Sequence, residues 1–192
     1  MDAPGFNFTR RMRHLIDDMV QRLPELSHID PSRVALSFAQ ARNRSRFGVY
    51  ATLTPMRFTG GQLTTRRRGQ TYTFQRLFDP SGREILYILT FYLPRFMDVD
   101  LHEKLVTILH ELWHISPEFD GDIRRHDGRC YAHSHSQQHY DAGLKPLADR
   151  WIAQAPSIEL YGFLQLNFTQ LRERFGPVYG TKIPQPKLLP CS

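Results

Sequence analysis

Three side chains in the run from Leu101 to Ile115 have the types and spacing of a hydrolytic metal site: His110, Glu111 and His114, in the pattern H-E-x-x-H. Residues four apart on a helix lie on one face, with Cβ atoms about 5 to 6 Å apart, so both imidazoles can reach one tetrahedral cation. Glu111 projects beside that cation, where it can take a proton from a metal-bound water. The spacing therefore predicts two metal ligands and a general base.

The same run has the pattern expected of a buried helix. Its large apolar residues recur at spacings of three and four: Leu101, Leu105, Ile108, Leu109, Leu112 and Ile115. Asp98 or Asp100 can cap the start of this helix, and Ser116 and Pro117 end it. Unpaired polar groups are costly inside a core, so we expect the two histidines and the carboxylate to be functional.

A catalytic zinc ion needs three protein ligands and one open position, so the third ligand must come from outside this helix. Asp120 follows His110 at the distance of the third ligand in a metzincin-like turn, although Pro117 stands where that turn uses glycine. His126 is the alternative, reached by a loop that turns back after the helix. Three further candidates follow in the chain: His133, His135 and His139.

Sequence periodicity predicts an α+β architecture around this helix. Apolar residues at spacings of three and four predict a helix over residues 8–23, which Pro24 ends. Alternating or continuous apolar residues predict four strands, over residues 33–40, 47–53, 72–78 and 85–93. The last of these is apolar almost throughout, which indicates a strand covered on both faces. The predicted fold is a mixed or antiparallel sheet of about four strands, packed against the N-terminal helix and the H-E-x-x-H helix.

The part of the chain after the histidine-rich loop is predicted to be largely helical. Residues 137–155 are expected to form a helix in two parts, interrupted at Gly143 and restarted at Pro146. A period of two predicts a further strand over residues 157–166, and helical spacing then resumes before Gly176, which suits a C-cap.

Length and composition predict one domain, over residues 1–176, followed by an extended, proline-containing tail over residues 177–192. The stretch 59–69 is expected to be a flexible hairpin connection. No window is apolar enough to span a membrane, and the N-terminus lacks the apolar region of a signal peptide, so we expect a cytoplasmic protein. The sequence predicts no particular oligomeric state.

The chain is basic, and its charge bears on the partners that it could bind. The chain has a net charge of +6 and a pI of about 9.6. The charge comes mainly from four arginine clusters: Arg10, Arg11 and Arg13; Arg42, Arg44 and Arg46; Arg66, Arg67 and Arg68; Arg124 and Arg125. Such clusters suit contact with nucleic acid, and they are also typical of solvated faces.

The chain resembles the zincin-type metallopeptidases of phages and prokaryotes, distant relatives of the SprT-like (Spartan-like) proteases. The resemblance is clearest from about Ile85 to Asp141 and rests on the buried H-E-L-x-H-I helix, an aromatic-Asp-Gly turn and an Arg-His pair. It implies His110, His114 and His126 as zinc ligands and Glu111 as the base. The chain departs from SprT-like proteins in lacking a C-terminal zinc ribbon, because Cys130 and Cys191 cannot supply four thiolates.

Two functions follow as hypotheses. The first is a zinc-dependent peptidase acting on a protein or peptide, which lies extended along a sheet edge above the helix while Glu111 activates the attacking water. The second strand or the third would supply that edge. The alternative is a non-catalytic module, in which four protein ligands close a zinc site and the arginine clusters contact nucleic acid or a protein partner.

Overall fold

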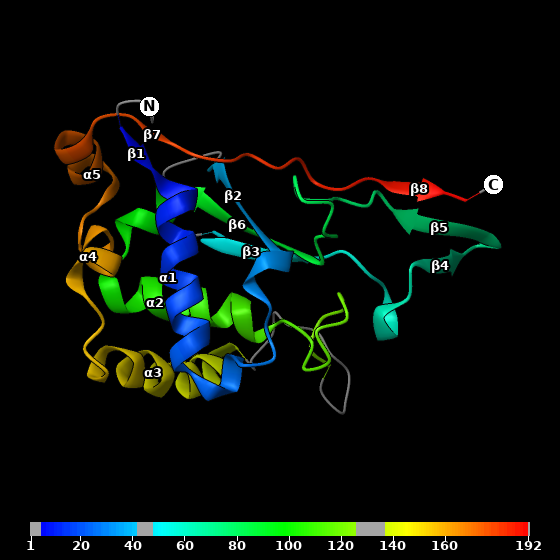
Figure 1. Cartoon of the computed structure of the whole chain (residues 1–192), viewed down its shortest axis with the longest axis horizontal. Coiled ribbons are helices and arrows are strands. Elements are labelled where there is room, and N and C mark those ends of the chain that lie inside the picture. The colour runs from blue at the N-terminus through cyan, green and yellow to red at the C-terminus, as the bar shows by residue number, and fades with distance from the viewer. Residues whose placement is uncertain (1–4, 42–47, 126–136, 192) are drawn as a thin grey trace.

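The computed structural model describes residues 5–41, 48–125 and 137–191; within 137–142 it describes the backbone alone. The chain has a mixed α+β fold, in which helices gather on one side of a small central sheet and a strand-built arm extends to the other side (Figure 1). The α+β class is therefore confirmed. No helix within the described ranges is long and apolar enough to cross a membrane.

Helix α1 (Phe8–Arg22) confirms the predicted N-terminal helix. The side chain of Asn7 caps it by accepting a hydrogen bond from the Arg10 amide at 3.1 Å. Residues at spacings of three and four point into the core from one face: Met12, Leu15, Ile16 and Met19, all fully buried. Leu23, just before Pro24, ends the helix.

The central sheet has three strands in the order β2 (Val34–Gln40), β6 (Tyr87–Leu93) and β3 (Ala51–Pro55). Strand β2 is parallel to β6, and β3 is antiparallel to it. Leu89 and Phe91 of β6 face the main core, whereas Ile88 lies in a second cluster with Met56 and Ile85. The prediction that β6 is covered on both faces is therefore confirmed.

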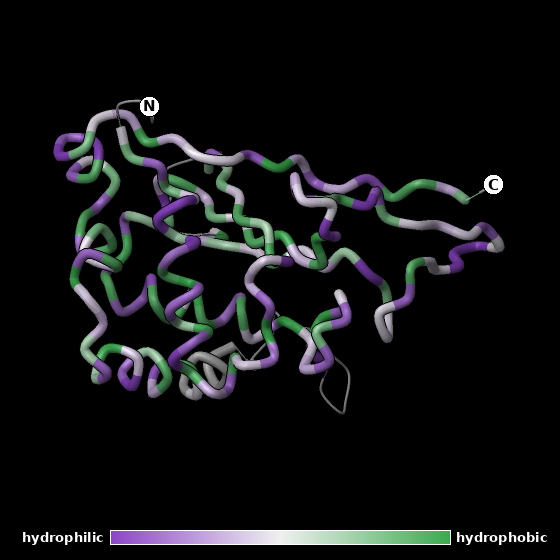
Figure 2. Tube along the Cα trace, in the orientation of Figure 1, coloured by the Kyte–Doolittle hydropathy of each residue, from purple (hydrophilic) through white to green (hydrophobic). Residues whose placement is uncertain are grey.

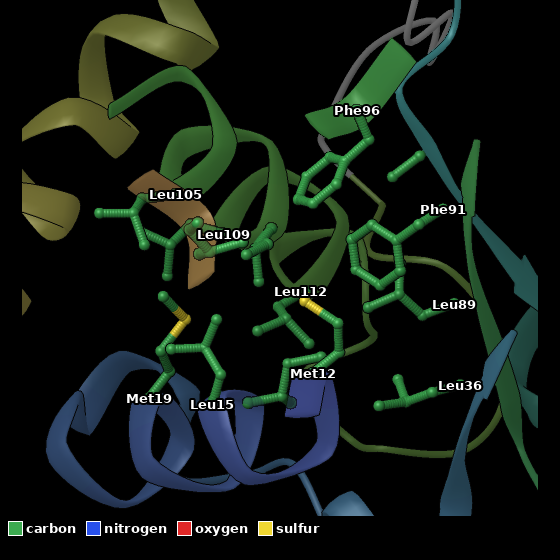
Figure 3. Close-up of a cluster of buried hydrophobic side chains, with 14 of the residues drawn as sticks. Met12, Leu15, Met19, Leu36, Leu89, Phe91, Phe96, Leu105, Leu109 and Leu112 are labelled. Carbon is green, nitrogen blue, oxygen red and sulfur yellow. The ribbon is translucent and has the colours of Figure 1, made fainter. Parts of the chain in front are cut away.

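Helix α2 (Leu101–Trp113) carries the H-E-x-x-H residues. Its N-cap is Asp100, whose carboxylate accepts a hydrogen bond from the Glu103 amide at 2.8 Å. Leu105, Leu109 and Leu112 pack against α1 and the central sheet (Figure 3). This packing holds α2 beneath the sheet and fixes the direction of its last turn.

Lys104 on the same helix is a buried cation that the sequence pattern does not reveal. Its side chain is 1% exposed, and its ammonium donates hydrogen bonds to the carbonyls of Leu164 at 2.7 Å and Leu166 at 3.0 Å. Burial lowers its pKa to about 8, against the opposing attraction of Asp98 and Asp100. Lys104 thus ties α2 to the C-terminal helical region.

The predicted third strand lies outside the central sheet, so the prediction of one four-stranded sheet is wrong. Strand β5 (Gln70–Phe74) pairs instead with β4 (Thr64–Arg67) and β8 (Leu188–Pro190) in a separate antiparallel sheet. This segment is rich in threonine and glutamine, which suits a solvated sheet better than a buried position. Four residues of the expected hairpin connection 59–69, Thr64–Arg67, are therefore strand.

The C-terminal helical region differs from prediction in two places. Helix α3 (Gln137–Ala153) continues through Gly143 and Pro146 as one helix, and it packs against α2. Residues 157–166 are not a strand: Ser157 caps α4 (Ile158–Tyr161), and a 3₁₀ helix follows over Gly162–Gln165. The apolar residues of this segment alternate, but the segment forms two short helices in succession.

Helix α5 (Phe168–Phe175) confirms the last predicted helix, with Gly176 as its C-cap at φ 83°. The remaining short elements are the strands β1 (Phe6–Asn7) and β7 (Val178–Tyr179) and the 3₁₀ helices Pro24–Leu26, Pro31–Arg33, Thr59–Gly61 and Arg95–Asp98.

The tail after Gly176 runs the length of the molecule from α5 to the arm (Figure 1). Strand β7 pairs in parallel with β1. The Phe38 amide then donates to the Thr181 carbonyl at 3.1 Å, and the Ile183 amide donates to the Ser37 hydroxyl at 2.9 Å. The tail thus follows β2 before its last strand, β8, joins the arm.

Candidate metal centre

The two motif histidines converge at the end of α2. Their Nε2 atoms are 2.9 Å apart, and the two rings lie nearly perpendicular with centroids 4.6 Å apart. Two nitrogens bound to one tetrahedral zinc ion would be about 3.3 Å apart, given Zn–N bonds of about 2.0 to 2.1 Å. His110 and His114 therefore fit two positions of a single metal ion.

His114 takes up its position because the helix ends there. It is the C-cap residue of α2, and its amide still bonds the carbonyls of His110 and Glu111, both at 3.3 Å. The last turn therefore remains helical, which keeps the i, i+4 relation of the two histidines.

Glu111 lies beside the two histidines and beneath the central sheet. The backbone N–H of Leu53 on β3 acts on its carboxylate and favours the ionised form. Burial has the larger effect and raises the pKa of Glu111 to about 7. The carboxylate is thus held by the sheet and largely shielded from solvent.

Strand β3 is an edge of the central sheet within the described chain, because its only neighbour there is β6. The Tyr92 amide bonds the Tyr50 carbonyl at 2.9 Å, and the Met56 amide bonds the Leu86 carbonyl at 3.0 Å. In an antiparallel pair these bonds recur at every second residue, so the polar groups of Leu53 point away from β6. The Glu111 carboxylate therefore lies at the free edge of β3.

The chain turns back along the end of α2 as soon as the helix stops. Ile115 and Ile123 form an antiparallel bridge, and the Arg124 amide donates to the His114 carbonyl at 2.7 Å. The Arg124 guanidinium lies 4.3 Å from the centre of the Trp113 ring and donates through Nε to the Trp113 carbonyl at 2.8 Å. The return segment is thus held against the turn that carries His114.

The buried carboxylate of Asp122 holds this return segment in place through hydrogen bonds. Its carboxylate is 5% exposed and accepts hydrogen bonds from the Gly60 amide at 2.9 Å and from Arg125 Nε at 2.8 Å. Burial alone would raise its pKa, but Arg125 and the amides of Gly60 and Ile123 outweigh that effect and lower it. Arg125 also donates to the Thr59 hydroxyl at 3.0 Å. Residue 125 is therefore fixed where the chain enters the predicted ligand loop.

Tyr87 supports the same turn from the core side. Its hydroxyl donates to the Asp122 carbonyl at 2.9 Å and accepts from the Gly121 amide at 3.0 Å. Burial raises its pKa to about 12, so the hydroxyl stays protonated and remains a donor. The roles of the buried residues Asp122 and Tyr87 were not predicted, because both act through contacts with residues distant in the sequence.

The structure describes only some of the predicted ligands. His126, His133 and His135 lie outside the described residues, and of His139 only the backbone, in α3, is described. Asp120 does not join the two histidines: its Oδ1 accepts from the Asp122 amide at 3.0 Å, and its side chain lies against Gly61. Among the residues described, no third histidine, cysteine, aspartate or glutamate completes a metal-binding group.

A helix that presents two converging histidines and an adjoining carboxylate at a sheet edge is typical of metallopeptidases. The comparison of sequences agrees with this class: the chain belongs to the family described as "Putative phage metallopeptidase", whose model matches residues 7–134. No curated protein and no solved structure matches the chain. The family region spans α1, the central sheet, α2 and the return segment, and so includes His110, Glu111 and His114.

Proposed function

We propose that the protein is a zinc-dependent peptidase that hydrolyses peptide bonds with Glu111 as the general base. The observation that carries this proposal is the convergence of His110 Nε2 and His114 Nε2, 2.9 Å apart, beside the Glu111 carboxylate. Imidazole nitrogens are preferred ligands of zinc. Membership of a metallopeptidase family supports a metal-dependent hydrolase in general.

His126 is the third ligand in this proposal. The bridge between Ile115 and Ile123 and the bond from Arg124 to His114 bring the return segment alongside the last turn of α2. Residue 126 follows the anchored Arg125 by one Cα step of about 3.8 Å. The finer resemblance to SprT-like proteases rests on the sequence motifs and agrees with this choice.

In this proposal the zinc ion and Glu111 carry out peptide hydrolysis, and the Leu53 amide assists Glu111. A zinc ion held by the three histidines would lower the pKa of water to about 7 and polarise the scissile carbonyl. Glu111 accepts the proton of the attacking water and later delivers it to the leaving amine. In this proposal the Leu53 amide, which favours the ionised form of Glu111, also orients its carboxylate for these transfers.

The substrate is a polypeptide in extended conformation along β3. The sheet edge beside Glu111 is formed by the second predicted strand, and the third predicted strand belongs to the arm. Outward-facing backbone groups of β3 can pair with a further strand. An extended substrate bound there would lie directly above the catalytic carboxylate.

Substitution of Glu111 tests the proposal. We expect Glu111→Gln to retain one zinc ion per chain while hydrolysis of an unfolded casein probe falls at least ~100-fold, the usual contribution of a general base. Glu103→Gln, on an exposed position of the same helix, is the matched control and should keep full activity. Full hydrolysis by Glu111→Gln would end this assignment.

The alternative of a non-catalytic, zinc-stabilised binding module is not favoured, since the family match is to a metallopeptidase. Zinc content and hydrolysis, measured on one preparation of the unmodified protein, distinguish the peptidase from the binding module. A closed structural site would hold zinc without hydrolysis in the unmodified protein as well, whereas a catalytic site keeps one exchangeable position.

A further inference from the structure

The arm formed by β4, β5 and β8 projects away from the helices and the central sheet (Figure 1). Strands β4 and β5 are joined by the two-residue turn Arg68-Gly69, in which both residues have positive φ, 49° and 82°. Such a turn matches the natural twist of a hairpin. Figure 2 shows that the end of this hairpin is hydrophilic.

The end of the arm is strongly basic. Arg66, Arg67 and Arg68 are consecutive and exposed, and the segment 59–75 that contains them has no aspartate or glutamate. The tail segment 177–191 also lacks acidic residues and adds Lys182 and Lys187. At the base of the arm, by contrast, Arg57 and Arg76 both pair with Glu84. Positive charge is therefore partly balanced at the base of the arm and left unbalanced at its end.

The end of the arm is a ribbon of two strands. The tail pairs with β5 as far as Pro190 with Tyr72, and the Cys191 amide still donates to the Thr71 carbonyl at 2.9 Å. Beyond it the hairpin ends in the pair of Arg67 with Gln70 and the turn. Neighbouring residues of a strand point to opposite faces, so Arg66 and Arg67 lie on opposite faces of this ribbon and Arg68 lies at its turn. The ribbon thus carries positive charge on both faces and at its end.

We propose that this hairpin binds double-stranded DNA by entering the major groove, where its arginines contact the phosphates on both sides. The major groove of B-form DNA is about 12 Å wide and admits a two-stranded ribbon. The major groove of an RNA helix is too narrow for side chains. Single strands are usually held by stacking on aromatic rings, and residues 66–71 include none.

The contacts proposed here are with the backbone of the DNA. Phosphate contacts fix the position of a protein without reading sequence, so we expect binding to any duplex. The inference depends on neither Glu111 nor the metal ligands, and it adds a second binding surface to the proposed peptidase. A peptidase that binds duplex DNA would act preferentially on polypeptides held near DNA.

Binding of a fluorescein-labelled duplex of about 30 base pairs to the full chain tests this proposal by anisotropy, between about 50 and 200 mM salt. The variant Arg66→Gln/Arg67→Gln/Arg68→Asn removes three charges, and asparagine suits the positive φ at the last position. The matched control, Arg11→Gln/Arg172→Gln/Arg174→Gln, removes three exposed charges far from the arm. A third variant replaces the three arm arginines by lysine.

We expect the neutral arm variant to bind at least ~10-fold more weakly than the unmodified chain and its salt slope to fall by about 2 to 3, since each phosphate contact contributes about 0.9. The control triple should bind within about twofold of the unmodified chain, and the lysine variant should keep the salt slope. Equal losses in both neutral triples, loss of the salt slope in the lysine variant, or tighter binding to single strands or to duplex RNA would overturn the proposal. Absence of duplex binding at low salt would overturn it as well, while leaving the peptidase assignment to its own test.

Discussion

The backbone N–H of Leu53, on the edge strand β3, acts on the carboxylate of Glu111 on α2 and favours its ionised form. This relation joins the sheet edge on which a substrate would lie to the group that would activate water. In the proposed mechanism it makes Glu111 depend on the backbone of β3.

Proline substitutions in β3 test this dependence. Leu53→Pro removes an N–H that points away from the sheet, so we expect the fold to persist. Turnover should fall about 10-fold, because Glu111 loses the N–H that favours its ionised form. Steady-state hydrolysis and metal content measure the effect.

Thr52→Pro is the matched control, because the N–H of Thr52 faces β6 in the ladder. We expect it to lower the free energy of unfolding by about 3 kcal/mol. If both variants lost activity in proportion to stability, the proposed orienting role of Leu53 would be rejected.

The choice of third ligand can be tested by metal binding alone. We expect His126→Ala to abolish stoichiometric zinc, because three protein ligands are needed for a stable catalytic site. Asp120→Ala should keep its zinc, since Asp120 is engaged with the Asp122 amide. Zinc measured by elemental analysis after dialysis decides between them, and the reverse pattern would assign the third position to Asp120.

Arg125 offers a test of how the return segment supports the site. Its side chain is 51% exposed, so Arg125→Gln should change the stability of the fold by less than about 1 kcal/mol. We nevertheless expect zinc affinity to fall about 10-fold, the lower end of the effect seen when groups supporting a metal ligand are removed. Competition with a fluorescent chelator measures this affinity.

The control for Arg125 is Arg83→Gln, which removes an arginine that is 56% exposed and paired with Asp79, away from the site. Its zinc affinity should match that of the unmodified chain. An equal fall in both variants would reflect net charge rather than the anchoring of residue 125.

Lys104 predicts an unusual dependence of stability on pH. Its pKa is about 8 in the folded chain and near 10.5 in the unfolded chain, so between these values the unfolded state binds more protons and stability rises with pH. The full shift corresponds to about 3 kcal/mol, which is lost as pH falls through 8. Above pH 10 the raised pKa of Tyr87 acts in the opposite direction, because the unfolded state then releases more protons.

Urea unfolding at several pH values between about 7.5 and 9.5 measures the slope predicted for Lys104. The variant Lys104→Met keeps a long side chain but has no charge to titrate, so its stability should be nearly flat over this range. An unchanged slope in that variant would assign the effect to another group.

The parts of the fold that the sequence predicts are those with strong local patterns. Helices α1 and α2 and strand β6 each have a long apolar period, and the structure agrees with the pattern. The residues of α4 and the following 3₁₀ helix alternate in polarity over too short a stretch to distinguish a strand from two helical turns. Gly143 and Pro146 lower helix propensity, but packing of α3 against α2 outweighs them.

Pairing between distant segments was not predictable in the same way. Strand β5 was expected to join the central sheet, but its partner β8 lies in the tail, and nothing in either local pattern indicates this match. The candidate site likewise has a part that local spacing predicts and a part that depends on contacts between distant residues. His110, Glu111 and His114 are found from their spacing, whereas the bond from Gly60 to Asp122 joins positions 62 residues apart and depends on the completed fold.

The parallel pairing of Phe6 with Val178 brings together residues 172 positions apart. Closing a chain segment of that length carries a large entropic cost, and so the pairing of β1 with β7 is expected to form late in folding and to open early. The tail that continues from β7 also supplies β8, so the Phe6 amide and the β5 amides bonded to β8 should exchange hydrogen together. The molecule can then lose the order of its arm by local opening while α1, α2 and the central sheet stay folded.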